Sequence, residues 1–359
     1  MSQLILKYHE LGSLNQGPQK QANQLEFRHA LSFIRQWRGG DEFFEFNTSG
    51  STGQPKTIRI ERWRMELSAQ RTIDALGLSE NMTALLCMSP AFIGGAMMIV
   101  RALMARMNLT IVPASRQPFE QLTVPFDFTA MVPMQLSELL ESGTKEQLQY
   151  LDNAQHLLLG GAGVSNELLK KIESLKTTCW STYGMTETVS HIALKQLNGS
   201  LPDKNFKVLD GVQIKTGDKG QLCIRDSITN DQWLETNDMV DIINEKEFVW
   251  LGRLDNVINT GGVKVMTDKV EMGVEMVMQE AFPDSRYFIA GMPHETYGTV
   301  VTLFLEHNSL VDDTDLLKKI KKEAPLSKYE FPKRLVILKS FPETDSGKID
   351  KQRILKSQS

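Results

Sequence analysis

One segment of the chain combines hydroxyls, glycines and a lysine with no apolar side chain. It reads Thr48-Ser49-Gly50-Ser51-Thr52-Gly53-Gln54-Pro55-Lys56. Glycines let backbone N–H groups approach an anion, hydroxyls add short donors, and the lysine adds a positive charge, so such a segment can replace much of the hydration of a triphosphate. The segment predicts a phosphate-binding loop, with an ordinary Ser/Gly surface turn as the alternative.

This loop differs from a Walker phosphate loop. Gly50 is followed five positions later by Pro55 rather than by a second glycine, so the register G-x-x-x-x-G-K-[ST] fails. The flanking residues 42–46 and 57–60 both read as short strands, which predicts a strand-loop-strand hairpin rather than a strand followed by a helix.

Two further segments contain residues suited to a nucleotide. In Tyr183-Gly184-Met185-Thr186-Glu187-Thr188, the glutamate alone could simply be a solvated helix cap. Beside a triphosphate it gains a role, because Mg²⁺ prefers one or two carboxylates together with phosphate oxygens and waters. The small residues Gly160, Gly161 and Ala162 after a predicted strand would let a flat ring approach the backbone, although they also suit an ordinary strand-to-helix turn.

Three later residues are common types on their own. Asp238 ends the segment 233–238 and suits a ribose diol, Arg253 lies beside a candidate hinge at Asp255, and Lys348 follows a glycine near the C-terminus. A lone aspartate most often belongs to a turn, and a lone lysine is usually a solvated charge. Their significance therefore depends on the order of all the motifs along the chain.

The elements that must position these residues alternate in type. Strand-like runs at residues 83–88, 109–112, 128–132, 156–159 and 177–181 alternate with helical stretches such as 134–142 and 166–175. Trp63, Leu67 and Ile73 predict the apolar face of another helix that ends at Gly77. The alternation predicts an α/β domain with parallel strands and covering helices.

The pattern changes from about residue 205, where short strands separated by turns suggest an antiparallel part. After residue 254, strands at 300–306 and 334–338 enclose a helix at 313–323. We therefore expect a large N-terminal α/β domain, residues 1–254, with parallel sheets and a small antiparallel part. A small mobile α+β C-terminal domain, residues 255–359, would follow on a hinge.

Composition limits the kind of protein. The 359 residues are 41% hydrophobic and 23% charged with a formal net charge of -4, so no nucleic-acid partner is indicated. The three cysteines are widely spaced and suggest neither disulfides nor a zinc site. No signal peptide is evident at the N-terminus, and the apolar run 91–100 is too short to span a membrane, so a cytoplasmic location is expected.

The order of the motifs resembles that of the adenylate-forming superfamily, which contains acyl-CoA ligases, adenylation domains and luciferases. The phosphate loop comes first, followed by the segment 183–188, Asp238, the segment 252–255 with Gly261-Gly262-Val263-Lys264-Val265, and Gly347-Lys348. The resemblance runs from Phe46 to the C-terminus. It implies an enzyme that uses ATP, Mg²⁺ and coenzyme A to activate a small carboxylic acid.

The resemblance also implies roles for individual residues. Thr48, Ser49, Gly50, Ser51, Thr52, Gly53 and Lys56 would hold the pyrophosphate end of ATP. Glu187 would bind magnesium and Thr186 a phosphate, while Gly160, Gly161, Ala162, Thr182, Tyr183 and Gly184 would line the adenine site. Asp238 and Arg253 would hold the ribose, and Lys348 would bridge the acyl carboxylate and the α-phosphate. Asp255 would be the hinge that brings Gly261 and Gly262 toward a thiol channel for coenzyme A.

Two features suggest the acid. The segment 183–194 resembles that of the o-succinylbenzoate–CoA ligases of menaquinone synthesis, and Arg101 follows Phe92, Gly94 and Gly95 on a helix that forms one wall of the acyl pocket in this superfamily. A dicarboxylic acid keeps one unreacted carboxylate, which a fixed guanidinium can bind through two hydrogen bonds. The alternative is that Arg101 extends from a helix end to solvent.

Some features depart from the superfamily pattern. Only 47 residues precede the phosphate loop, so part of the usual N-terminal scaffold is expected to be absent and a partner chain, such as a second copy in a homodimer, could cover the surface. Phe92 replaces a His-containing motif, Asn237 a glycine and Lys351 an arginine. Of six histidines only His191 lies near a motif, and no histidine is assigned a catalytic role.

Two other functions stay open. The chain could load an activated acyl group onto a carrier protein instead of coenzyme A. It could also be a catalytically silent nucleotide-binding module, although the presence of both Glu187 and Lys348 argues against this.

Overall fold

The computed structural model of the protein describes residues 3–9, 25–47, 57–283, 285–309, 312–343 and 349–358, except for the side chains of residues 25, 26 and 47. The chain forms two compact units. Unit 1 comprises residues 1–215, 223–234 and 242–249, and unit 2 comprises residues 216–222, 235–241 and 250–359. The expected boundary after residue 254 stays a prediction, because the division runs through several strands rather than through one linker.

A parallel sheet forms the centre of unit 1. Its strands are β4 (Thr83–Leu86), β5 (Asn108–Ile111), β6 (Phe128–Met131), β7 (His156–Leu159) and β8 (Thr178–Gly184), in the spatial order β5-β4-β6-β7-β8. All four neighbouring pairs are parallel, which confirms the alternation predicted from the sequence. The short strand β1 (Leu4–Leu6), which the sequence pattern did not reveal, pairs antiparallel with β5 at the sheet edge.

Beyond β8 the sheet becomes antiparallel, as expected. Strand β9 (His191–Gln196) pairs with β8, and β10 (Phe206–Val208) follows it. The sheet continues with β14 (Glu247–Arg253), β13 (Leu234–Asn244), β12 (Gln221–Arg225) and β11 (Gln213–Thr216). A separate hairpin consists of β2 (Phe43–Asn47) and β3 (Thr57–Glu61), the two strands predicted to flank the phosphate loop.

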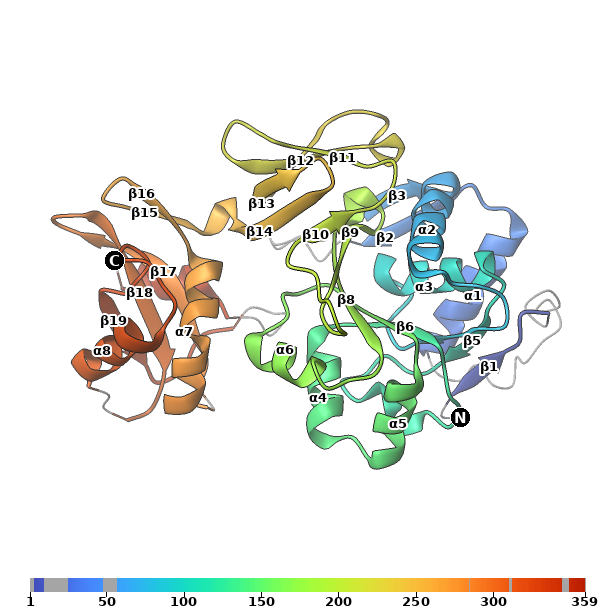
Figure 1. Cartoon of the computed structure of the whole chain (residues 1–359), viewed down its shortest axis with the longest axis horizontal. Coiled ribbons are helices and arrows are strands. Elements are labelled where there is room, and N and C mark those ends of the chain that lie inside the picture. Colours follow the sequence, from blue (N-terminus) through green and yellow to red (C-terminus); the bar gives the residue numbers. More distant parts are fainter. Residues whose placement is uncertain are drawn as a thin grey trace. The chain divides into compact units, whose positions relative to one another are not determined.

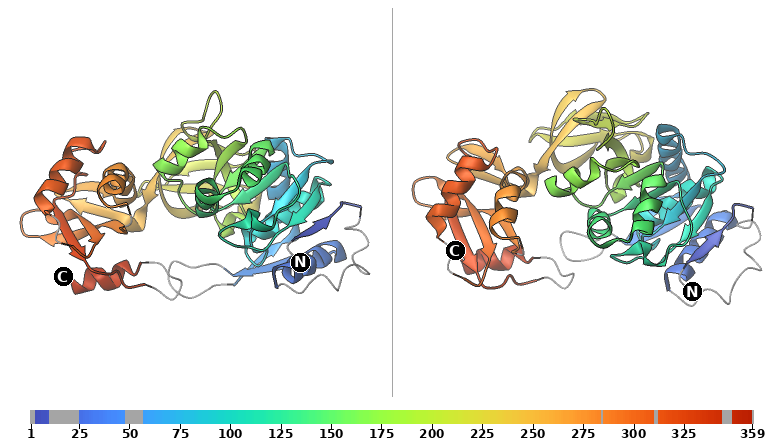
Figure 2. Two further views of the ribbon diagram at one scale, coloured as in Figure 1. Left: turned by 90° about the horizontal axis from the view of Figure 1, so that it is seen from below. Right: turned by 60° about the horizontal axis from the view of Figure 1, so that its bottom comes forward.

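Helices cover both faces of the parallel sheet (Figures 1 and 2). One face carries α1 (Leu25–Gly39), α2 (Arg62–Leu76) and α3 (Ile93–Met104). The other carries α4 (Pro133–Ser142), α5 (Lys145–Asn153) and α6 (Asn166–Ile172). The buried strands supply both cores by alternation, since Ala84 and Leu86 face the first core while Leu85 faces the second.

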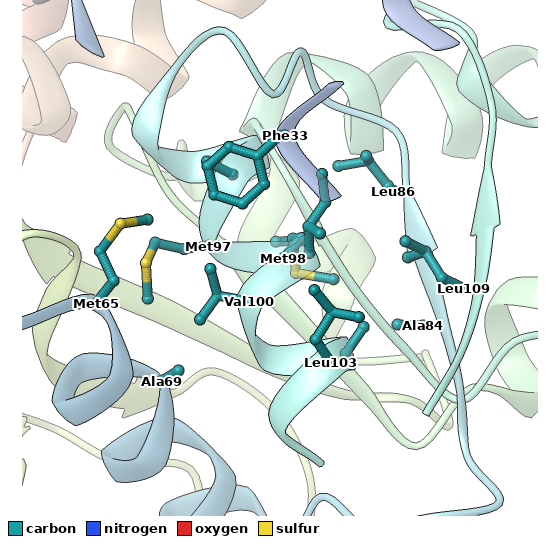
Figure 3. Packing of buried hydrophobic residues seen from close by; sticks show 14 of the residues in the cluster. Phe33, Met65, Ala69, Ala84, Leu86, Met97, Met98, Val100, Leu103 and Leu109 are labelled. Atoms are coloured by element: carbon teal, nitrogen blue, oxygen red, sulfur yellow. The ribbon is translucent and has the colours of Figure 1, made fainter. Parts of the chain in front are cut away.

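Helix α3 is the most deeply packed element around the candidate site. Figure 3 shows Met97, Met98 and Val100 of this helix among Met65 of α2 and Phe33 of α1. Residues 93–100 of the apolar run 91–100 therefore belong to a buried helix. One expectation was wrong in detail, because Trp63 at the start of α2 is 44% exposed and does not belong to the apolar face.

The larger part of unit 2 is an α+β structure, as predicted. Strands β17 (Tyr287–His294), β18 (Gly298–Glu306) and β19 (Arg334–Leu338) form a sheet in which β18 is central, and β15 (Val257–Thr260) and β16 (Val263–Met266) form a hairpin. Helices α7 (Thr267–Ala281) and α8 (Asp313–Glu323) pack on one face of the three-stranded sheet, and α9 (Lys351–Ser357) contributes to the core on the other (Figure 1). None of the helices in the described ranges is long and apolar enough to cross a membrane.

Candidate active site

The candidate residues of unit 1 gather where the parallel strands end. Gly160 follows β7, and Thr182 lies on the neighbouring β8, because Leu159 pairs with Ser181. The Thr182 hydroxyl donates a hydrogen bond to the Leu159 carbonyl over 3.1 Å. A Cβ on Gly160 would lie 2.6 Å from that hydroxyl oxygen, so only glycine leaves this approach undisturbed. Open parallel sheets bind ligands at this carboxyl edge.

Tyr183 and Gly184 lie at an irregularity between β8 and β9. The register shifts between these two residues, a type of distortion that often occurs beside active sites. The Tyr183 ring contacts Phe248 edge-on, with the ring centroids 5.2 Å apart. A Cβ on Gly184 would collide with the backbone of Ser190 and His191, which packs the turn between the strands tightly.

That turn, residues 185–190, has a constrained backbone. A short 3₁₀ segment, η3 (Thr186–Thr188), is followed by Val189 with φ 66° and ψ −40°. The Ser190 N–H donates to the Thr188 carbonyl over 2.8 Å, which closes a γ-turn around Val189. A positive φ is a strained backbone conformation for a β-branched residue such as Val189, and such strain is often found at functional sites.

Glu187 projects from η3 into solvent. Its side chain is exposed, and in the described part of the chain it has no hydrogen-bond or ion-pair partner. An exposed, unpaired carboxylate can bind a hard cation that also holds phosphate oxygens. No cluster of three acidic, histidine or cysteine side chains that could hold a metal ion occurs among the described residues.

Arg101 lies inside unit 1, not at its surface. Its side chain belongs to α3 and is only 2% exposed, which rules out the alternative that it extends to solvent. One guanidinium nitrogen donates to the Ser190 hydroxyl over 2.9 Å, while the buried Nε has no hydrogen-bond partner among the described residues. Within the described ranges no carboxylate pairs with Arg101, and burial lowers its pKa to about 9.

Three polar residues beside Arg101 were missed by the sequence reasoning. Ser190, His191 and Thr72 join it in one buried group, with 3.0 Å between the Thr72 hydroxyl oxygen and His191 Nε2 and 3.5 Å between the Ser190 hydroxyl oxygen and Nδ1. Burial, and then the charge of Arg101, hold the pKa of His191 well below 6.5. The signal available in the sequence was that Ser190 and His191 lie within the segment 183–194, which resembles that of the o-succinylbenzoate–CoA ligases.

The start of α3 explains one of the three residues predicted before Arg101. A Cβ on Gly95 would lie 2.6 Å from the carbonyl carbon of Ser89 and 2.8 Å from the Pro90 nitrogen, so this glycine lets the helix pack on the preceding segment. Gly94 has more room, and Phe92 is half exposed at the N-cap position.

In unit 2, Arg253 lies between two carboxylates. Its guanidinium is 3.7 Å from Asp238 and 3.1 Å from Asp255, and its backbone N–H donates to Asp268 over 3.2 Å. The Trp250 indole N–H donates to Asp238 over 3.2 Å, a contact that the sequence did not predict. Asp238 and Asp255 therefore both form ion pairs with Arg253.

Gly261 and Gly262 form the turn of the β15–β16 hairpin. Their φ values of 56° and 82° are those of a tight hairpin turn that favours glycine at both central positions. The phosphate loop, Thr48 to Lys56, and Lys348 lie outside the described residues.

Comparison with known proteins identifies the family. The model of the AMP-binding enzyme family matches residues 20–229. The 2-succinylbenzoate–CoA ligase of Staphylococcus epidermidis is 24% identical over 333 residues, which cover 86% of this chain and 68% of that protein. The Escherichia coli enzyme of the same name is 27% identical, with coverages of 86% and 67%.

Solved structures agree. An acyl-CoA synthetase (AMP-forming)/AMP-acid ligase II-like protein from Dyadobacter fermentans is 35% identical, with a TM-score of 0.66, 99% of this chain covered and 100% of that one. O-succinylbenzoate coenzyme A synthetase from Bacillus subtilis, in complex with ATP and magnesium ion, shares the fold at 22% identity, with a TM-score of 0.68 and coverages of 87% and 69%. The chain belongs to the AMP-binding enzyme family, the adenylate-forming superfamily of acid–thiol ligases.

Proposed function

We propose that the protein adenylates o-succinylbenzoate with ATP and transfers the acyl group to coenzyme A. The observation that carries this choice is the buried guanidinium of Arg101, which has no carboxylate partner in the described part of the chain. A buried charge without a partner is unfavourable, and a carboxylate from the substrate would compensate it. Among carboxylic acids, only one with a second carboxylate offers this compensation after its first has reacted.

The substrate names of the relatives support the same acid. Two of the curated relatives are 2-succinylbenzoate–CoA ligases, each aligned over 86% of this chain. Identities of 24% and 27% leave the acid open, and the buried charge of Arg101 favours a dicarboxylic acid. Because Arg101 is almost fully enclosed, the acid must displace neighbouring side chains to reach it.

The nucleotide roles are proposed for each unit by itself. In unit 1, the Gly160–Ala162 turn, Thr182, Tyr183 and Gly184 would contact the adenine, Thr186 would bind a phosphate oxygen, and Glu187 would hold the magnesium ion. In unit 2, Asp238 would accept hydrogen bonds from the ribose hydroxyls, with Arg253 and Trp250 holding its carboxylate in place. The loop from Thr48 to Lys56 would bind the pyrophosphate end of ATP.

The first half-reaction needs charge compensation and alignment more than covalent catalysis. An oxygen of the acid attacks the α-phosphorus, the bond to the β-phosphate oxygen breaks, and pyrophosphate leaves. Lys348 would neutralise charge on the acyl carboxylate and the α-phosphate together. Magnesium, when bound, would offset the negative charge of the phosphates.

The second half-reaction attaches a thiol. The sulfur of coenzyme A attacks the acyl carbon of the mixed anhydride, the thioester bond forms and AMP departs. The mixed anhydride is prone to hydrolysis, so water must be kept away from it between the two steps. We propose Asp255 as the hinge for this change and Gly261 with Gly262 as the hairpin that approaches the thiol channel.

A panel of carboxylic acids tests the proposal. The protein is incubated with ATP, Mg²⁺, coenzyme A and each acid, and AMP and the thioester are measured by chromatography. We expect o-succinylbenzoate to give both products, and monocarboxylic acids of the same skeleton to react much less efficiently. No AMP from o-succinylbenzoate alongside turnover of another acid would contradict the substrate, and AMP formation without a coenzyme A thioester would favour a carrier protein as the acceptor.

A further inference from the structure

The polar group around Arg101 forms a chain with a consistent hydrogen-bond direction. The Thr72 hydroxyl lies 3.2 Å from the Ser68 carbonyl, to which it can only donate. Its oxygen must then accept from His191 Nε2 at 3.0 Å, which places the proton of the imidazole on Nε2. Nδ1 is left as an acceptor, and the Ser190 hydroxyl can donate to it.

This direction leaves the Ser190 oxygen free to accept from Arg101. The guanidinium donates to that oxygen over 2.9 Å, and a guanidinium has no acceptor atoms, so the hydroxyl proton must point elsewhere. His191 Nδ1 receives it. The neutral imidazole required here agrees with the low pKa that burial and Arg101 impose on His191.

The contact with Ser190 is the only hydrogen bond of the Arg101 side chain within the described ranges. Arginine side chains have many rotamers, and one hydrogen bond fixes the guanidinium only if the acceptor itself is fixed. The γ-turn at Val189 holds the Ser190 backbone, and His191 sets the direction of its hydroxyl. Thr72, from α2, completes the chain on the far side of the imidazole.

We propose that His191 is a positioning residue that holds Ser190, and through it Arg101, in the orientation that binds the second carboxylate of a dicarboxylic acid. The inference rests on the proposed function of Arg101. It assigns no contact with the acid to His191 itself, so its effect should appear in the binding of the acid and not in the chemistry.

Two substitutions of His191 distinguish the roles of its two ring nitrogens. Asparagine can place an amide oxygen near the position of Nδ1 and still accept from Ser190, whereas glutamine reaches toward the position of Nε2 and loses that acceptor. We expect His191→Gln to raise the KM for o-succinylbenzoate by roughly tenfold, the loss of about one hydrogen bond to a charged group. His191→Asn should stay within about threefold of wild type, and neither should change the KM for ATP by more than about twofold.

Thr72→Val provides a second test if a histidine variant does not fold. It removes the acceptor of His191 Nε2 with little change in shape, and it should raise the KM for the acid by about threefold. Thr110→Val is the matched control, because Thr110 is fully buried on β5 and its hydroxyl oxygen has no hydrogen-bond partner among the described residues. This control should leave every kinetic constant unchanged.

The outcomes distinguish the positioning role of His191 from the proposed function of Arg101. Failure of the wild type to form AMP with any dicarboxylic acid would overturn both. A wild type that uses o-succinylbenzoate, with Arg101→Met selectively impaired for this acid, would support the proposed function. If His191→Gln and Thr72→Val then leave the KM for the acid unchanged, or raise it equally for monocarboxylic acids, the positioning role is wrong.

Discussion

Arg101→Met should make the protein more stable while it weakens binding of the acid. Methionine keeps an unbranched side chain in the core and removes the charge. In most cores the loss of a buried polar side chain destabilises the protein, because a partner is left unpaired. Here the described part of the chain offers the guanidinium one neutral acceptor, Ser190, and no counter-ion.

The expected gain in stability can be worked out from the pKa of Arg101. Burial lowers the pKa of Arg101 well below the usual value of an arginine, to about 9. At about 1.4 kcal/mol per pH unit, this corresponds to a cost on the order of 5 kcal/mol for holding the charge in the folded protein at pH 7. In Arg101→Met, loss of the hydrogen bond to Ser190 should lower the free energy of unfolding by about 2 kcal/mol, and imperfect packing of methionine should lower it by about 1 kcal/mol. Since removal of the buried charge raises it by more, we expect a net increase of about 2 kcal/mol.

The pH dependence of stability tests whether the charge of Arg101 is the cause of the difference between wild type and variant. At neutral pH Arg101 is charged in both the folded and the unfolded state, so the full cost is present. Above about pH 9 the folded protein releases this proton while the unfolded chain keeps it, and the wild type therefore gains stability relative to the variant. The advantage of Arg101→Met should shrink as the pH rises through that range.

Arg71→Met is the matched control. Arg71 is also a buried arginine of unit 1, but it forms an ion pair of 2.5 Å with the buried carboxylate of Asp226. Removing one partner of such a pair leaves the other charge uncompensated, which costs about 3–5 kcal/mol. The same substitution should therefore stabilise at position 101 and destabilise at position 71.

Urea unfolding followed by tryptophan fluorescence measures both variants. Four of the five tryptophans, Trp37, Trp63, Trp180 and Trp233, lie in unit 1, so the signal reports mainly on the unit that contains Arg101. Added o-succinylbenzoate should raise the midpoint of the wild type and leave Arg101→Met unaffected. A loss of more than about 1 kcal/mol in Arg101→Met, or a shift of both arginine variants in the same direction, would refute the reasoning.

The remaining predictions concern four other residues. Gly160→Ala should raise the KM for ATP and lower the thermal midpoint, because the new Cβ meets the Thr182 hydroxyl at 2.6 Å, and adding Thr182→Ala should restore part of the thermal midpoint. Glu187→Gln should raise the Mg²⁺ concentration for half-maximal pyrophosphate exchange by roughly tenfold. Because the side chain is exposed, the free energy of unfolding should change by less than about 0.5 kcal/mol, and an unchanged Mg²⁺ dependence would show that Glu187 does not bind the metal. His191 has a pKa well below 6.5 in the folded protein, so below that pH only the unfolded chain binds its proton. Between about pH 7 and about pH 5.5, urea unfolding should show wild type losing about 1.3 kcal/mol more stability than His191→Asn. Lys348→Ala should abolish AMP formation from the acid and ATP while thioester formation from supplied acyl-adenylate continues, and equal loss of both half-reactions in single-turnover assays would contradict its assigned role.

The reaction class could be predicted from the sequence because its signals are local. A loop rich in glycine and hydroxyls, a glutamate after a strand and a C-terminal lysine keep their order in any structure, and the alternation of strands and helices is visible as periodicity. The family match over residues 20–229 agrees with that prediction. Strand β17 and helix α7 were not recognised, although the residues of α7 that join the core, Val270, Val274, Val277 and Met278, follow a helical period.

The environment of Arg101 was decided only by the tertiary structure. An arginine in an apolar helix can extend to solvent or turn inward, and the choice depends on what covers the helix. Here the covering side chains come from far along the chain, because Ser190 lies 89 positions from Arg101 and His191 lies 119 positions from Thr72. Sequence alone thus determined the adenylating chemistry, whereas the packing of α2, α3 and β9 buried the charge of Arg101, on which the proposal of a dicarboxylic acid rests.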